Sequence, residues 1–224
     1  MIQYPEIIIF DLDNTLVQSR IDFVKLRNAL THFVQENDLL NGGQFHNMPI
    51  SKILAAIEDS SGPESTASKQ AWEIVEEYEN EGMIKATVSD DVVPSLVRIR
   101  KLGIKTAVFT NNSNNSAAPV LDKFQLGPFD VVKTRDNVKA MKPSGFGLLD
   151  IVQVLSGSLE RTYFVGDSYV DGLCAQDAGI KFIAFGAEIR SIEERGIPYY
   201  TRVEDMKQLA EFVELRLPKV TDRS

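Results

Sequence analysis

Cysteine, histidine and long apolar runs are scarce in this 224-residue sequence, and each shortage excludes a kind of site or fold. Cys174 is the only cysteine, so an intramolecular disulfide is impossible and a reducing cytoplasm fits best. His32 and His46 are the only histidines and have no metal-ligand spacing. No apolar run is long enough to span a bilayer, and the first ten residues lack the basic start of a signal peptide. We therefore expect a cytoplasmic protein with no membrane partner.

Positive charge is also in short supply, with 24 Lys and Arg against 32 Asp and Glu and a formal net charge of −8. An acidic surface repels nucleic acid and anionic lipid, so neither is an expected partner. Hydrophobic residues make up 43% of the chain, which is ordinary for a globular protein with a buried core. The length suits one core domain with a sizeable insertion.

Five short apolar runs predict strands that are buried on both faces, as in the parallel sheet of an α/β protein. The runs are Ile7–Phe10, Ile104–Phe109, Phe129–Val132, Tyr163–Val165 and Phe182–Phe185. Helical spacing alternates with these runs from residue 90 onward. The predicted helices are the segment from Asp90 or Asp91 to Leu102, then Ala117–Phe124, Phe146–Leu155, Val170–Ala178 and Glu204–Leu215. The alternation predicts a Rossmann-like parallel sheet flanked by helices.

The segment that follows the first strand breaks this alternation and contains no convincing buried strand. It has three stretches of helical spacing, at Ile21–Val34, Ile50–Ile57 and Ala67–Glu81. Breaks at Asn41–Gly43 and Ser60–Pro63 separate them. We predict that residues 18–87 form a small all-helical domain and that residues 1–17 and 88–224 form the α/β core.

Acidic and hydroxyl residues stand where three of the predicted strands end. Asp11 and Asp13 follow the first strand, Thr110 and Asn111 follow the second, and Asp167 follows the fourth. In a doubly wound sheet, ligands bind outside the carboxyl ends of the strands, so we expect these residues to converge there. Converging carboxylates repel one another unless a cation lies among them, and hard oxygen ligands suit Mg²⁺. The sequence therefore predicts a magnesium site at this edge.

A phosphoryl group bound at such a site would need a further positive charge. Lys142 and Lys139 are the candidates. The following Pro143 favours Lys142, because proline restricts the preceding residue to an extended conformation and can begin the next helix.

Together these residues resemble the haloacid dehalogenase superfamily of phosphatases, with all four of its signatures in the right order. They stand here as Asp11-Leu12-Asp13-Asn14-Thr15, Val108-Phe109-Thr110-Asn111, Lys142-Pro143 and Gly166-Asp167-Ser168-Tyr169-Val170-Asp171. Asn14 occupies a position where the family often has glycine, a mild departure because asparagine tolerates the left-handed backbone conformation. The resemblance implies that the helical insert is a cap domain that closes over the site and contacts the substrate.

The resemblance also implies a role for each matching residue. Asp11 would be the nucleophile that becomes phosphorylated, and Asp13 the acid and base that serves the leaving group and then water. Mg²⁺ would be held by an Asp11 oxygen, the Asp13 backbone carbonyl and Asp167. The Thr110 hydroxyl and the Asn111 backbone N–H would bind the phosphoryl group. Lys142 would neutralise charge on both groups, Asp171 would orient metal-bound waters or Lys142, and Thr15 would brace the first loop.

The expected activity is magnesium-dependent hydrolysis of a small phosphorylated metabolite. A phosphomutase of the β-phosphoglucomutase kind would use the same core and remains an alternative. A dehalogenase and a phosphonate hydrolase are disfavoured, because Asp13 is needed for phosphoryl chemistry and not for theirs. A catalytically inactive binding protein with this fold is the alternative of another class, but it would be expected to have lost at least one of the site residues. The sequence does not identify the substrate, the oligomeric state or the specificity residues.

Overall fold

The computed structural model describes residues 4–39, 48–186 and 189–216, and within it the chain divides into two compact units. One unit comprises Met1–Gln18 and Thr87–Ser224, and the other comprises Ser19–Ala86. We call them the core unit and the insert unit. The predicted break at Asn41–Gly43 and His46 lie outside the described residues.

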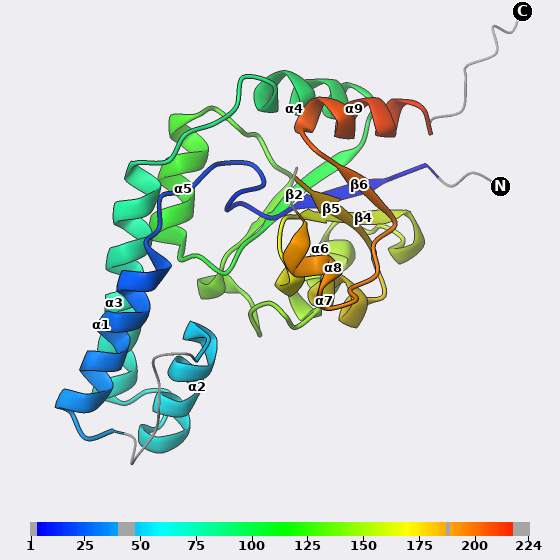
Figure 1. Ribbon diagram of the computed structural model, residues 1–224. Helices are drawn as coiled ribbons and strands as arrows, with labels where there is room; N and C mark the ends of the chain where they lie inside the picture. Colours follow the sequence, from blue (N-terminus) through cyan, green and yellow to red (C-terminus); the bar gives the residue numbers. More distant parts are fainter. Residues whose placement is uncertain (1–3, 40–47, 187–188, 217–224) are drawn as a thin grey trace, which may run out of the picture. The chain divides into compact units, whose positions relative to one another are not determined.

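The core unit is built on a six-stranded sheet with the strand order β3-β2-β1-β4-β5-β6, and every pairing is parallel (Figure 1). The strands are β1 (Ile7–Phe10), β2 (Lys105–Phe109), β3 (Val131–Lys133), β4 (Thr162–Gly166), β5 (Lys181–Phe185) and β6 (Thr201–Val203). All four residues of β1 are buried, as its unbroken apolar run predicts for a central strand. The predicted α/β fold class is confirmed. The last strand, β6, was not predicted.

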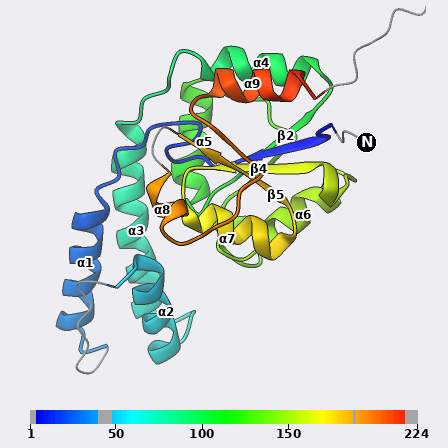
Figure 2. The same ribbon diagram turned by 45° about the vertical axis from the view of Figure 1, so that its right-hand side comes forward.

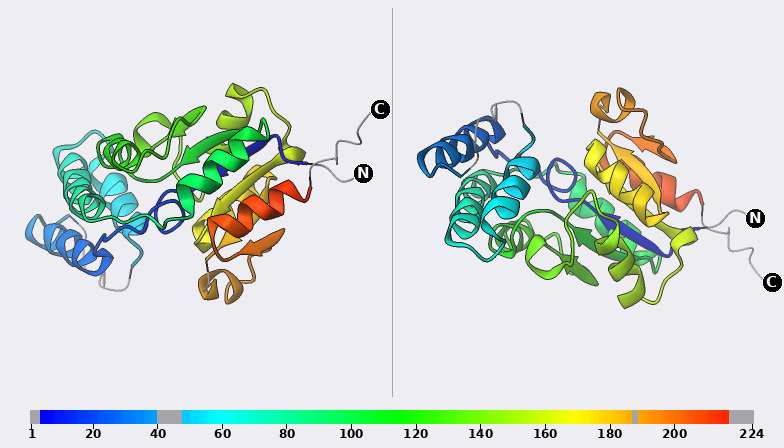
Figure 3. Two further views of the ribbon diagram at one scale, coloured as in Figure 1. Left: turned by 90° about the horizontal axis from the view of Figure 1, so that it is seen from above. Right: turned by 90° about the horizontal axis from the view of Figure 1, so that it is seen from below.

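Helices cover the sheet on both faces, and Figure 3 shows α4 and α9 on one face and α6 and α7 on the other. The helices of this unit are α4 (Val92–Lys101), α5 (Asn114–Lys123), α6 (Phe146–Val154), α7 (Tyr169–Ala178), α8 (Arg190–Glu193) and α9 (Met206–Glu214), with 3₁₀ helices at Arg135–Asn137 and Leu159–Arg161. Side chains alternate across a strand, so Ile7 and Ile9 pack with α6 and α7. The short α8 was not predicted.

The insert unit contains α1 (Phe23–Glu36), α2 (Ile50–Ser61) and α3 (Thr66–Ile84), all visible in Figure 2. Its helices bury an apolar cluster of their own, which includes Leu30, Ile53 and Val75. Asp22 caps α1 by accepting a hydrogen bond from the Lys25 N–H, at 3.0 Å. All three helices end beyond their predicted stretches, whereas α1 begins two residues later than predicted, after its Asp22 cap. None of the helices in the described ranges is long and apolar enough to cross a membrane.

The chain leaves and re-enters the core unit at Gln18 and Thr87, which form a short antiparallel bridge. Two backbone hydrogen bonds join them, with N–O distances of 2.8 and 3.1 Å. The bridge pairs the two connections at the boundary of the core unit.

Candidate active site

The loop that follows β1 presents Asp11 at the carboxyl end of the central strand. The backbone N–H of Asp11 donates to the Val165 carbonyl on β4 at 2.9 Å, so the residue is still held by the sheet. The chain then turns through Asn14, which has a φ of 57°. The sequence predicted that asparagine would tolerate this left-handed conformation. The Thr15 hydroxyl, predicted only to brace the loop, also donates to Asp11 Oδ2 at 3.3 Å.

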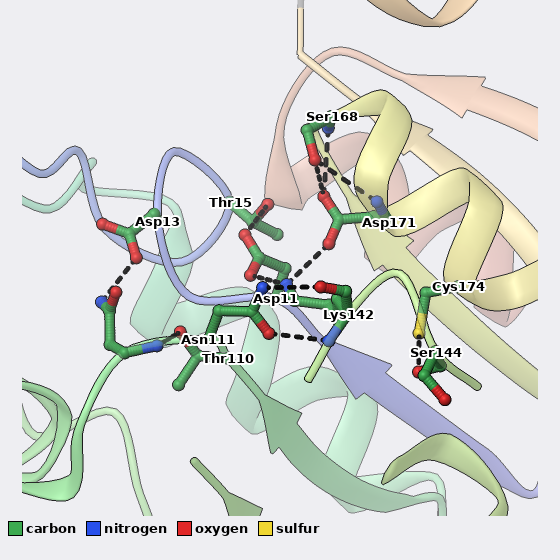
Figure 4. A network of polar contacts seen from close by, with 11 residues as sticks. Asp11, Asp13, Thr15, Thr110, Asn111, Lys142, Ser144, Ser168, Asp171 and Cys174 are labelled. Atoms are coloured by element: carbon green, nitrogen blue, oxygen red, sulfur yellow. Dashed lines mark hydrogen bonds and ion pairs between the residues drawn. The ribbon is translucent and has the colours of Figure 1, made fainter. Parts of the chain in front are cut away.

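Lys142 joins two acidic residues that are far apart in the sequence (Figure 4). Its Nζ donates to Asp11 Oδ1 at 2.5 Å and to Asp171 Oδ1 at 2.7 Å, and its side chain is 5% exposed. The competing candidate, Lys139, instead places its Nζ 4.9 Å from the centre of the Phe146 ring. The structure therefore brings Lys142, and not its neighbour, to the acidic group. Pro143, expected as a possible helix start, lies in a turn before α6.

The side chain of Asn111 fixes the backbone of Lys142. Its Nδ2 donates to the Lys142 carbonyl at 3.0 Å, and its Oδ1 accepts from the Lys142 N–H at 2.8 Å. These paired bonds join the loop after β2 to the loop before α6. This use of the Asn111 side chain was not predicted, since the sequence assigned only its backbone N–H to phosphate binding.

Asp171 serves both the helix and the acidic group. It is the third helical residue of α7, and its Oδ2 accepts from the N–H and hydroxyl of Ser168 at 3.1 and 2.5 Å. Its Oδ1 faces Lys142. A Cβ on Gly166 would lie 2.6 Å from the Asp171 Cβ, so only glycine leaves room for this packing at the end of β4. The sequence analysis missed Ser168, although the Ser-x-x-Asp spacing is a capping-box signal.

Thr110 and Asp13 lie at the neighbouring strand ends. Thr110 is buried, its N–H donates to the Lys133 carbonyl on β3 at 3.0 Å, and its hydroxyl accepts from the Asn112 N–H at 3.2 Å. The Asp13 Oδ2 accepts from Asn112 Nδ2 at 2.6 Å. Figure 4 shows the Asp13 carboxylate apart from the group formed by Asp11 and Lys142. Asn112 was not predicted, and no pattern in the sequence marks it.

Three carboxylates have the chemistry and the spacing to hold a metal ion. One oxygen each from Asp11, Asp167 and Asp171 lie within 4.8 Å of one another. This donor set fits Mg²⁺, which prefers a few carboxylate oxygens and keeps positions open for water and phosphate. It differs in one member from the predicted set, which included the Asp13 backbone carbonyl and gave Asp171 a supporting role.

Burial and mutual repulsion shape the acidity of this group. Burial raises the pKa of Asp11 well above its ordinary range; Lys142 opposes this rise, and Asp171 adds to it. Burial, followed by the charge of Asp171, raises the pKa of Asp167 to about 7. Burial alone would lower the pKa of Lys142, but the charges of Asp11 and Asp171 outweigh it and raise that pKa above its usual value. One lysine thus balances several carboxylates, and a divalent cation would stabilise their ionised forms.

Comparison with known proteins identifies the family to which the chain belongs. The chain matches the family described as haloacid dehalogenase-like hydrolase over residues 8–185. Phosphoglycolate phosphatase of Pseudomonas fluorescens strain Pf-5 is 26% identical over 189 residues, which cover 80% of this chain and 69% of that protein. PpaX of Caldanaerobacter subterraneus subsp. tengcongensis, provisionally named a pyrophosphatase, is 31% identical over 155 residues, which cover 66% of this chain and 70% of that protein.

A solved structure from Bacteroides fragilis, provisionally named a haloacid dehalogenase-like hydrolase, shares the fold. It matches with a TM-score of 0.67 and 22% identity and covers 92% of this chain and 99% of that one. Because the family model covers residues 8–185, more than half of the sequence, the chain belongs to the haloacid dehalogenase-like hydrolase family. The prediction of a phosphatase of this family is confirmed by the family match and the relatives.

Proposed function

We propose that this enzyme hydrolyses a small phosphomonoester with Mg²⁺ through a transient aspartyl phosphate, an acyl phosphate, on Asp11. The observation that carries the proposal is the contact of Lys142 with both Asp11 and Asp171 in a buried group that also includes Asp167. In such a group, Lys142 would stabilise the ionised carboxylate of Asp11 until that carboxylate attacks phosphorus.

In the first step, an Asp11 oxygen attacks phosphorus while the bond to the leaving oxygen breaks. Lys142 neutralises charge on the nucleophile and on the transferring phosphoryl group. The Thr110 hydroxyl and the Asn111 backbone N–H bind phosphoryl oxygens. Asp13 gives a proton to the leaving oxygen, so that a neutral alcohol departs.

In the second step, water attacks the phosphorus of the aspartyl phosphate at Asp11. Asp13, now a carboxylate, removes a proton from that water, and Asp11 is released as the bond to phosphorus breaks. Asp11, Asp167, Asp171 and the Asp13 backbone carbonyl are the groups that would hold Mg²⁺. When bound, the ion would neutralise phosphoryl charge and orient the group for in-line displacement.

The insert unit is proposed to act as the cap that selects the substrate. The support is its position in the chain directly after the nucleophile loop, together with its own folded core. The relatives named as phosphoglycolate phosphatases and a pyrophosphatase suggest small, highly charged phosphates as the first substrates to assay. We further propose a cytoplasmic location, because the single cysteine fits a reducing compartment.

A substrate panel with matched variants tests this function. Purified protein is assayed for phosphate release from phosphoglycolate, pyrophosphate, sugar phosphates and p-nitrophenyl phosphate. EDTA should abolish activity, and added Mg²⁺ should restore it. Asp11→Asn should lower kcat by roughly a thousandfold or more, whereas Asp122→Asn at an exposed site on α5 should not. Full activity in EDTA, or in the Asp11 variant, would reject the proposal.

The phosphomutase alternative predicts a different product. A mutase returns the phosphoryl group to a sugar hydroxyl, whereas a hydrolase releases one inorganic phosphate for each substrate consumed. Measuring both quantities on the same sugar phosphate separates the two reactions. Substrate loss without phosphate release would favour the mutase.

A further inference from the structure

Asn112 contacts the proposed proton carrier, although no motif includes it. The residue lies three positions beyond the end of β2, and only 6% of its surface is exposed. Its Nδ2 donates to Asp13 Oδ2 at 2.6 Å, a short hydrogen bond of the kind formed between an amide and a carboxylate. Asn112 therefore lies one contact away from the group that handles the proton in both steps.

The backbone of Asn112 is held on both sides, which restricts where its amide can point. Its N–H donates to Thr110 Oγ1 at 3.2 Å, and its carbonyl accepts from the Arg135 N–H at 3.1 Å. The next residue, Ser113, caps α5 by accepting from the Ser116 N–H. A donor fixed at both ends keeps its geometry without an entropic cost at the moment of reaction.

The preceding asparagine has the same side chain and a different partner. Asn111 directs its amide to the backbone of Lys142, whereas Asn112 directs its amide to the side chain of Asp13. Two adjacent residues at the end of one strand thus hold the proposed charge-neutralising group and the proposed acid and base. These contacts give a role to the side-chain amides of Asn111 and Asn112, which the proposed phosphate binding does not use.

We propose that Asn112 is a positioning residue for proton transfer by Asp13. By holding Oδ2 of Asp13 as a hydrogen-bond acceptor, Asn112 orients the carboxyl group that carries the proton. In the first step, that proton passes to the leaving oxygen as its bond to phosphorus breaks and the Asp11–phosphorus bond forms. In the second step, the same carboxylate of Asp13 takes a proton from the attacking water. The inference rests on the proposed function.

Two substrates whose leaving groups differ in acidity can separate a role in proton transfer from a general loss of activity. The ratio kcat/KM reports the steps up to the first irreversible one, which here is release of the leaving group. An alkyl phosphate needs a proton on its leaving oxygen, whereas p-nitrophenolate departs without one. A defect in proton delivery therefore lowers kcat/KM for the alkyl substrate and not for the aryl substrate, while a general loss of folded enzyme lowers both equally.

The experiment compares four proteins on both substrates. Asn112→Ala removes the amide, Asp13→Asn removes the proton carrier, and the double variant Asp13→Asn/Asn112→Ala tests their dependence. Asn115→Ala, an exposed asparagine on the first turn of α5, is the matched control. Thermal unfolding of each protein confirms that the compared samples are folded.

For Asn112→Ala we expect kcat/KM to fall about tenfold to a hundredfold on the alkyl phosphate, which is a fraction of the roughly hundredfold to ten-thousandfold contribution of general acid catalysis, and less than about threefold on p-nitrophenyl phosphate. In the double variant, the Asn112 change should add no further loss. Equal losses on both substrates, or a further loss in the double variant, would overturn the positioning role. If Asp13→Asn itself shows no dependence on the leaving group, the proposed function fails instead.

Discussion

The buried ion pairs of the core unit and the exposed ion pairs of the insert unit are arranged in opposite ways. In the core unit, Lys142 is paired with Asp11 and Asp171, which are 131 and 29 residues away in the sequence, and the exposed fractions of the three side chains are 5%, 6% and 2%. Among the described residues of the insert unit, the lysine–carboxylate ion pairs join residues at most five positions apart, with side chains that are 44–91% exposed. The same residue types thus have different environments in the two units.

The difference shows that the fold of the core unit holds together a buried group of charges that would separate in water. Exposed pairs gain little, because solvent screens them and ordering two long side chains costs entropy. A buried group costs desolvation energy and persists only where distant parts of the fold hold its partners in place. The chemistry of this enzyme is therefore expected to depend on the core unit, while the exposed charges of the insert unit are exchangeable.

Among the variants that test this comparison, the largest effect is expected from removing the shared lysine. Lys142→Met leaves Asp11 and Asp171 without their common partner in a buried site, so the free energy of unfolding should fall by about 3 kcal/mol without added metal. Activity should fall roughly a hundredfold to a thousandfold, because charge on the transferring group is no longer neutralised. Urea denaturation and steady-state kinetics measure the two effects.

Mg²⁺ provides the internal control for this variant. If the lost stability arises from repulsion among the carboxylates, added Mg²⁺ should restore more stability to Lys142→Met than to the unmodified protein. Identical stability of the two proteins without metal would contradict the view that this lysine balances the acidic group.

A smaller effect is expected from crowding Asp171. In Gly166→Ala the new methyl group would lie 2.6 Å from Asp171 Cβ, which forces a shift at the end of β4. Overpacking of this kind costs about 1–3 kcal/mol, and the displaced carboxylate should also lower kcat. Gly127→Ala is the control, since its new atom would come only within 3.8 Å of the Phe129 nitrogen. Equal behaviour of the two variants would show that close packing at β4 is unimportant.

The parts of the fold that the sequence predicted are those in which one physical requirement dominates. A strand buried on both faces must be apolar throughout, and Ile7–Phe10 matches β1 residue for residue. By contrast, β6 has three residues at a sheet edge, one of them the exposed Arg202, and the four-residue α8 is too short for a periodic pattern. Whether such short peripheral elements form depends on the residues they pack against, and those residues are distant in the sequence.

The site shows the same limit. Asp11 and Lys142 were expected to meet, because Asp11 follows a strand end where ligands bind and Lys142 was the favoured source of the positive charge that a phosphoryl group needs there. The contacts of Asn112 and of the Asn111 side chain were not expected, because they depend on which way an amide points within a loop. Thr15 shows the intermediate case: its place in the loop was predicted, and its hydroxyl contact with Asp11 was not.

A modest effect is expected at the turn of the nucleophile loop. Asn14 has a φ of 57°, and alanine there should lower the free energy of unfolding by about 1 kcal/mol, because its Cβ crowds the backbone in this conformation. Asn14→Gly is the matched control and should be close to neutral. Chemical denaturation of both variants measures the difference, and an alanine variant as stable as the glycine variant would show that the loop has relaxed to another conformation.

The smallest effect is expected in the insert unit, where the comparison with Lys142 can be made directly. Lys85 donates to Glu81 at 2.5 Å, the same distance that separates Lys142 from Asp11, but both side chains are about 60% exposed. Lys85→Met should therefore leave the unfolding midpoint and kcat on p-nitrophenyl phosphate unchanged within error, since water replaces the lost contact. A loss comparable to that of Lys142→Met would mean that distance, rather than burial and the fold, determines what a charge pair contributes in this protein.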